Sequence, residues 1–176
     1  MTEHAAPRRI IVLRHAKADW PQVDDHERPL AERGRAEAPV AGQWLADSGI
    51  NPEYVLCSTS VRTRETWKLA AHELPKRQRR TVFEKRIYDA TAGEIIEVLK
   101  ETPGDVADLL LVGHNPGVQN LVEVLAGDES LGDELNQLRQ RGFPTAGIAV
   151  LTFDGAWDGV EPGVGRLVSY YVPSVD

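Results

Sequence analysis

Short apolar runs alternate along this chain with longer segments in which apolar residues recur every three or four positions. The run IIVLR at 10–14 is typical of a short buried strand, and residues 108–127 have the pattern of a strand, a tight turn and a helix. In the helix predicted over 28–49, we expect Pro39 to start a new segment or to kink the helix. The other predicted elements are strands within 54–58, 81–90, 146–153 and 166–172, helices over 59–74 and 93–101, and an irregular or helical insertion over 131–144.

This order of elements predicts the fold class. Strands that alternate with helices are typical of parallel sheets whose crossover helices cover both faces. We therefore expect an α/β protein, a three-layer α/β/α sandwich with a mostly parallel central sheet and helices on both faces. A length of 176 residues fits a single domain, 1–176, with a sizeable core.

Composition and charge narrow the classes of function. The chain is 41% hydrophobic and 27% charged, and it has no apolar run near the roughly 18 residues that a membrane span needs. A net charge of −7 disfavours nucleic acid or an anionic membrane as a partner. The one cysteine, Cys57, is expected in the core and suits a reducing compartment. Since the start MTEHAAPRR also lacks the apolar core of a signal peptide, we expect a cytoplasmic location.

Charged and polar residues follow three of the predicted strands. Arg14 and His15 end the first, the segment 58–62 follows the second, and the segment 113–115 follows the apolar run LLLV. In open parallel sheets, ligands bind beyond the carboxyl ends of the strands. Two histidines and two arginines would meet at this edge, so the sequence predicts an anion pocket that contains a nucleophile or a base.

The segments LRHAKAD, STSVRTRET and VGHNPGV, in this order within one domain, resemble the histidine phosphatase superfamily, which has the phosphoglycerate mutase-like fold. The small size and the segments ERPLAERG and GHNPGV are similar to the SixA-type phosphohistidine phosphatases within it. The resemblance covers residues 9–172. One departure is Ala16, which stands where the signature usually has glycine after Arg-His.

The resemblance implies a role for each of four residues. His15 would be the nucleophile, and its other ring nitrogen would donate to a backbone carbonyl so that the attacking nitrogen keeps its lone pair. Arg14 and Arg62 would bind the phosphoryl oxygens through paired hydrogen bonds. His114 would be a second cation on the transferring group. Each of these residues alone also has a structural interpretation, at a strand end, in a turn or on a solvated helix face.

Three further residues are predicted to bind substrate. Arg28 would be an additional cation on the substrate side, although it could instead pair with a nearby carboxylate of Asp24, Asp25 or Glu27. Ser58 would donate a hydrogen bond, and Asn115 lies in the turn that opens a helix.

No metal or other cofactor is expected. His15, Asp19 and His114 would form a familiar ligand set of two histidines and a carboxylate. However, two arginines in the same pocket would repel a divalent cation, and the chain has no cluster of histidines at ligand spacing.

The substrate depends on whether the site holds a general acid. An alkoxide leaving group needs a proton donor, whereas imidazole, with a pKa of about 6.5, leaves as a neutral ring. Asp89 is the one candidate acid within KRIYDATAGE, and it could equally cap the following helix.

Three functions remain open. The first is a phosphatase that acts through a phosphohistidine intermediate on His15 and takes a phosphohistidine protein as substrate. The second is a phosphatase for a small phosphorylated metabolite, which would need Asp89 or another acid. The third is a non-catalytic module that binds phosphorylated ligands. The segment 128–144 could serve as a lid, a partner surface or a cover for the sheet edge.

Overall fold

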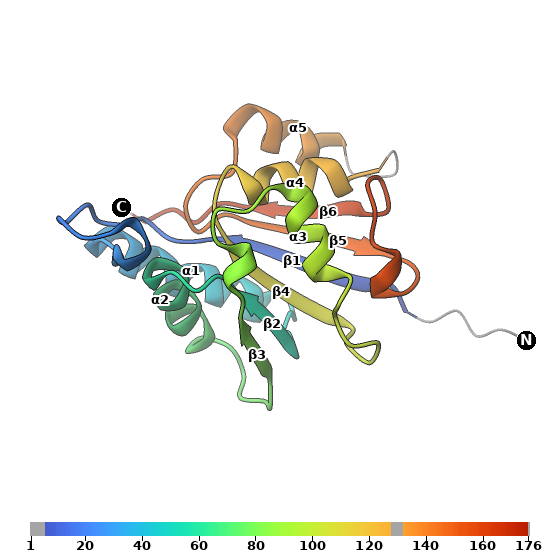
Figure 1. The fold of residues 1–176 in the computed structure, drawn as a ribbon, viewed down its shortest axis with the longest axis horizontal. Coiled ribbons are helices and arrows are strands. Elements are labelled where there is room, and N and C mark those ends of the chain that lie inside the picture. The colour runs from blue at the N-terminus through green and yellow to red at the C-terminus, as the bar shows by residue number, and fades with distance from the viewer. Residues whose placement is uncertain (1–5, 128–131, 176) are drawn as a thin grey trace, which may run out of the picture.

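A computed structural model describes residues 6–127 and 132–175 of the chain (Figure 1). Within these residues, six strands form one sheet in the order β3-β2-β4-β1-β5-β6. The strands are β1 (Arg8–Arg14), β2 (Tyr54–Cys57), β3 (Arg80–Phe83), β4 (Asp108–Gly113), β5 (Ile148–Phe153) and β6 (Arg166–Tyr171). The helices are α1 (Glu32–Asp47), α2 (Val61–Ala71), α3 (Ala92–Leu99), α4 (Gly117–Leu125) and α5 (Gly132–Arg141), with short 3-10 turns η1 (Asp25–Glu27), η2 (Lys85–Ile87) and η3 (Trp157–Gly159).

The sheet is mostly parallel. Strands β3, β2, β4 and β1 run in one direction, while β5 is antiparallel to β1 and β6 is antiparallel to β5. The predicted fold class is therefore confirmed. The two antiparallel pairs, β1–β5 and β5–β6, both involve the last two strands of the chain.

Helices cover both faces of the sheet. Figure 1 shows α1 and α2 on one side, and α3, α4 and α5 on the other. Side chains of β1 alternate between two buried clusters, because successive residues of a strand point to opposite faces: Ile11 and Leu13 join one cluster, Ile10 and Val12 the other. Burial on both faces explains why the first strand reads as an unbroken apolar run.

Pro39, expected to start a new segment or to kink the helix, lies inside one continuous helix. Helix α1 runs from Glu32 to Asp47 with Pro39 inside it, so the prediction of a new segment there is wrong. Proline removes one backbone hydrogen bond, but Ala38, Ala41 and Leu45 are fully buried on this helix. Packing against α2 and the sheet therefore holds the helix together through the proline.

The segment 128–144 contains helix α5, which lies over the same face as α4 (Figure 1). Leu138 on this helix is fully buried in the cluster beneath it. Residues 128–131 lie outside the described part of the chain. The helical interpretation of 131–144 is thus confirmed for Gly132–Arg141. Helix α5 packs over the sheet as a cover, through the buried Leu138.

Candidate active site

Three neighbouring parallel strands deliver the predicted site residues to one edge of the sheet. Arg14 at the end of β1 is paired with Gly113 at the end of β4, so the next residues, His15 and His114, emerge side by side. Their ring centroids are 5.4 Å apart. Ser58 follows β2 on the other side of β4 and donates its backbone N–H to Val112 O at 3.0 Å. Parallel pairing therefore brings together residues that are about 100 positions apart in sequence.

His15 is held as a neutral imidazole whose Nε2 has no hydrogen-bond partner among the described residues. Its Nδ1 lies 2.7 Å from Ala16 O, and a carbonyl only accepts hydrogen bonds, so Nδ1 carries the proton and Nε2 keeps its lone pair. The side chain is buried, with 8% of its surface exposed. Burial, together with the charges of Arg14, Arg62 and Arg28, lowers the pKa of His15 to about 4. The arrangement that the resemblance implies for a nucleophile is present.

The backbone beyond His15 is held by two buried polar side chains. Ala16 N–H donates to Thr66 Oγ1 on α2 at 2.9 Å, and Lys17 N–H donates to Glu37 Oε1 on α1 at 2.8 Å. Both helices thus fix the carbonyl that orients the imidazole. The usual glycine is replaced by Ala16, whose methyl group is fully buried.

The two predicted phosphate-binding arginines have donors that no described residue pairs. Arg14 Nη1 donates to Phe143 O at 2.9 Å, and Arg62 lies in the first turn of α2 with 6% of its surface exposed. The Nε atoms of both arginines, like His114 Nδ1, are buried without a hydrogen-bond partner in the described part of the chain. Because an unpaired buried donor is costly, an anion bound among these groups would gain hydrogen bonds that the protein does not supply.

His114 is neutral in the free protein. Its Nε2 lies 2.7 Å from Ser58 Oγ. Burial, together with the neighbouring His15 and the charge of Arg62, lowers the pKa of His114 to about 3. The neutral ring is therefore favoured in the free protein, because burial and neighbouring positive charge both disfavour the charged form, and the predicted cation at His114 concerns the state with a phosphoryl group bound. When Ser58 donates to Nε2, the neutral ring carries its proton on Nδ1 and remains a hydrogen-bond donor.

Both imidazoles should stay neutral over the physiological pH range. We expect the ring signals of His15 and His114 to show no titration between pH 8 and pH 5.5, because burial and the arginines favour the neutral form. Proton–nitrogen NMR of the free protein measures this directly. Addition of vanadate should raise the pKa of His114, since an oxyanion favours the charged ring.

The lowered pKa values of His15 and His114 also affect the stability of the protein. Below about pH 6.5 the unfolded chain binds protons that folded His15 and His114 do not, so the free energy of unfolding should fall as the pH decreases. Urea unfolding at several pH values provides the comparison. Ring signals of His15 and His114 that titrate near pH 6.5 in the folded protein would contradict the assignment of neutral rings.

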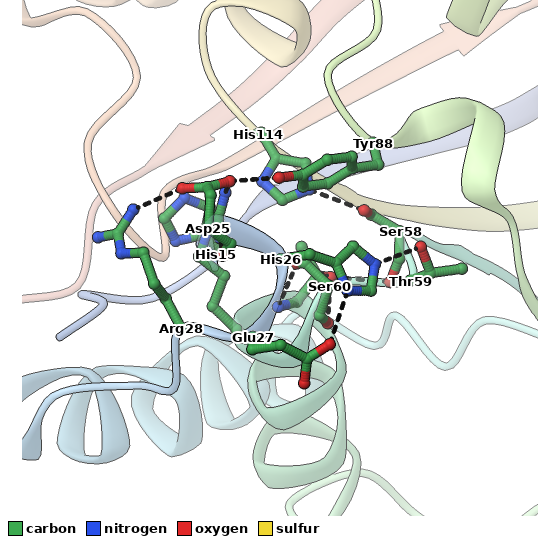
Figure 2. A network of polar contacts seen from close by, with 12 residues as sticks. His15, Asp25, His26, Glu27, Arg28, Ser58, Thr59, Ser60, Tyr88 and His114 are labelled. Carbon is green, nitrogen blue, oxygen red and sulfur yellow. Dashed lines mark hydrogen bonds and ion pairs between the residues drawn. The ribbon is translucent and has the colours of Figure 1, made fainter. Parts of the chain in front are cut away.

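The structure adds two residues to the site, namely Asp25, which the sequence gives only as a possible partner of Arg28, and Tyr88, which the sequence analysis missed. Asp25 accepts hydrogen bonds from Arg62 Nη2 at 3.0 Å, from Arg28 Nη1 at 3.1 Å and from Tyr88 OH. Its backbone oxygen accepts from Arg62 Nη1 at 2.7 Å. Figure 2 shows Asp25 between Arg28 and Tyr88, close to His15 and His114.

Aromatic and imidazole rings complete this side of the site. Tyr88 meets His114 edge-on at 5.4 Å and His26 at 4.9 Å between ring centroids. His26 lies 2.8 Å from Thr59 Oγ1 through its Nε2. The sequence gives one indication of this group of side chains, namely that Asp25 stands three residues before Arg28, with which it forms an ion pair.

The predicted substrate residues have different environments. Arg28 is buried, donates from Nε to Asp19 O at 3.0 Å and lies over the Trp20 ring at 3.3 Å. It also pairs with Asp25, one of the three carboxylates that the sequence leaves open as partners. Asn115 uses its side chain within the fold: Nδ2 donates to Phe143 O at 3.0 Å.

Asp89 lies at the rim of a hollow of about 200 Å³, lined by Asp25, Arg62, Tyr88, Asp89, Ala90, His114, Asn115, Pro116 and Gly117. Its side chain is exposed and its backbone has φ +56°, a conformation that favours glycine. Helix α3 is capped by Thr91 and Glu94 in a reciprocal capping box, so the alternative that Asp89 caps this helix is wrong.

Two further properties concern the described residues only. They contain no group of three or more His, Cys, Asp or Glu side chains arranged to hold a metal ion. None of their helices is both long enough and apolar enough to cross a membrane.

Cys57 is fully buried, and burial raises the pKa of its thiol to about 12, as expected for the core residue predicted from the sequence.

Comparisons with known proteins find relatives similar to this chain over nearly its whole length. An uncharacterized protein of Mycobacterium tuberculosis H37Rv is 40% identical over 162 residues, covering 92% of this chain and 99% of the relative. A structure from Nakamurella multipartitia, assigned to the SixA phosphohistidine phosphatases, has a TM-score of 0.84 and 29% identity, over 98% of this chain and 100% of that one. A protein of Agrobacterium tumefaciens with the same assignment has a TM-score of 0.77 and 30% identity, over 96% of this chain and 100% of that one.

The family model of the histidine phosphatase superfamily, branch 1, matches residues 10–141. This range includes the two histidines and the two arginines that the strands bring together. The chain belongs to the histidine phosphatase superfamily, branch 1.

Proposed function

We propose that this protein is a phosphohistidine phosphatase that removes the phosphoryl group from a histidine of a phosphorylated protein. The observation that carries the proposal is the hydrogen bond from His15 Nδ1 to Ala16 O, which leaves Nε2 of a buried, neutral imidazole free to attack phosphorus. The relatives assigned to the SixA phosphohistidine phosphatases support the same class of substrate.

The reaction proceeds in two steps on this chain. His15 Nε2 forms a bond to phosphorus while the bond to the leaving group breaks, and water then hydrolyses the phosphohistidine intermediate. Arg14 and Arg62 supply positive charge to the phosphoryl oxygens, and His114 Nδ1–H donates to them. Binding alone would need only the cationic groups, so the fixed tautomer of His15 favours an enzyme over a non-catalytic binding module.

The acid–base state of the site favours an imidazole leaving group. Hydrogen bonds from Tyr88, Arg28 and Arg62 hold the pKa of Asp25 well below its usual range, so this carboxylate has no proton to donate at neutral pH. An alkoxide leaving group would need such a donor, whereas imidazole does not. A single buried cysteine also suits the cytoplasmic location that we propose for this activity.

One observation favours a small phosphate ester as a second candidate substrate. Asp89 is exposed at the rim of the hollow beside Tyr88, where a protonated carboxyl group could reach a leaving oxygen. Hydrolysis of a small phosphate ester would depend on Asp89, whereas hydrolysis of phosphohistidine would not.

A direct comparison of substrates tests the proposal. We expect a phosphohistidine peptide to release phosphate at least about 100-fold faster than an alkyl phosphate. General acid catalysis contributes a factor of about this size, and the alkyl ester would have to react without it here. Phosphate release is measured for both substrates, with His15→Ala as the blank. Equal turnover of the alkyl ester, lost in Asp89→Asn, would support the second candidate instead.

A further inference from the structure

The residues of the site are ordered by depth. His15 and Arg62 lie at the floor, with 8% and 6% of their surfaces exposed, whereas the side chain of Asp25 is 52% exposed. In phosphoryl transfer the nucleophile and the leaving group lie on opposite sides of phosphorus. Because His15 attacks from the floor, the leaving group departs toward the rim, where Asp25, Tyr88 and Asp89 line the hollow.

Asp25 is held firmly at this rim. Arg62, Arg28 and Tyr88 all donate to its carboxylate, and Arg62 also donates to its backbone oxygen. Behind it, the loop between β1 and α1 closes through Asp19 N–H, which donates to Pro29 O at 2.8 Å. Figure 2 shows the resulting network around the two histidines. The carboxylate therefore has a fixed position relative to Arg28 and Arg62.

The hydrogen-bonding capacity of Asp25 discriminates among leaving groups. An ionised carboxylate only accepts hydrogen bonds. Because Arg28 and Arg62 balance its charge, the selection comes from this acceptor and not from the net charge of the rim. Phosphohistidine that is protonated on its distal ring nitrogen presents both an N–H group and a positive charge. A carboxylate-bearing or phosphate-bearing metabolite presents no N–H group there, so it gains no hydrogen bond from Asp25.

We propose that Asp25 determines leaving-group specificity, by accepting a hydrogen bond from the distal N–H of the protonated imidazole of phosphohistidine. This inference rests on the proposed phosphohistidine phosphatase activity and specifies how that substrate is chosen. His15 Nε2 forms the new bond to phosphorus as the P–N bond breaks. The electron pair of that bond passes to the ring nitrogen, so the protonated ring departs as neutral imidazole with its N–H still on Asp25.

Asp25 could instead serve only to orient Arg62, since both Nη atoms of Arg62 donate to it. The two roles predict different results. If Asp25 only orients Arg62, its loss weakens the binding of every phosphoryl group. If Asp25 contacts the leaving group, its loss affects only substrates whose leaving group carries an N–H. The comparison therefore needs two substrates whose leaving groups both depart without a general acid.

The experiment compares Asp25→Asn with the matched control Asp24→Asn, which changes an exposed neighbour whose side chain does not cap the adjacent turn. Each variant is assayed on a phosphohistidine peptide and on 4-nitrophenyl phosphate, whose leaving group has no N–H and departs as an anion. We expect the ratio of kcat/KM for the two substrates to fall by about 10- to 100-fold in Asp25→Asn, the range for a hydrogen bond to a charged group, and to stay constant in Asp24→Asn.

Two outcomes would overturn the inference. If Asp25→Asn lowers kcat/KM for both substrates by the same factor, Asp25 acts only through Arg62. If the unmodified protein releases no phosphate from the phosphohistidine peptide, the proposed function fails and the inference fails with it. Thermal unfolding of each variant shows whether a loss comes from misfolding, and the ratio of the two substrates is independent of the fraction folded.

Discussion

Replacement of His15 by alanine is expected to lower phosphate release from a phosphohistidine peptide on the order of 10⁴-fold or more, because the attacking nitrogen is removed and the remaining groups only bind the phosphoryl group. The unmodified protein should also form a covalent phosphoenzyme that is labile in acid and stable in alkali. Rapid quenching with a radiolabelled substrate measures both the rate and the intermediate.

The matched control is His72→Ala, which removes an exposed histidine that directly follows helix α2. This variant should retain both the rate and the phosphoenzyme. A covalent intermediate that persists in His15→Ala would show that another residue is the nucleophile. A buried imidazole is also a packing element, so thermal unfolding of His15→Ala is needed to show that the fold is intact.

The second large effect concerns Arg62. Its replacement by alanine should lower kcat/KM on the order of 10³-fold, because one positively charged group on the transferring phosphoryl group is lost. Asp25 would also lose one of its three side-chain donors, which makes the rim more negative. Arg62→Lys should recover only part of the activity, since an ammonium group lacks the planar fork of the guanidinium.

Arg64→Ala, two residues further along the same helix, is the control, because the Arg64 side chain is exposed. Steady-state kinetics and the dissociation constant of vanadate should separate the two variants clearly. Equal effects of Arg62→Ala and Arg64→Ala would mean that only the net charge of the helix matters. In that case Arg62 would not contact the phosphoryl group.

The sheet and the floor of the site were predictable from sequence for one reason. A strand buried on both faces has an unbroken apolar run, so its end can be located to within a residue, as at Arg14 and Gly113. The residues that follow such ends lie together whenever the strands are parallel neighbours. The order and spacing of His15, Arg62 and His114 therefore contained most of the information about the floor.

The rim and the charge states were not predictable in this way. Asp25 reaches the site through the path of a loop that has no periodicity, and Tyr88 through a 3-10 turn after an edge strand. The neutral state of His114 depends on how deeply the ring is buried beside His15 and Arg62. Helix α1 continues through Pro39 because of its packing, which local propensity does not report.

The sheet order also separates the floor and the rim in their local stability. The floor follows β2, β4 and β1, three adjacent strands with paired neighbours on both sides. Such strands open only when the whole domain unfolds, whereas edge elements with exposed backbone open more readily. Tyr88 and Asp89 follow β3, which lies at the edge of the sheet and has mostly exposed side chains. The side of the rim that follows β3 can therefore fluctuate to admit a bulky protein substrate, while the phosphoryl-binding groups and Asp25, which Arg28 and Arg62 hold, keep their places. Access and chemistry then depend on different cooperative units of one small domain.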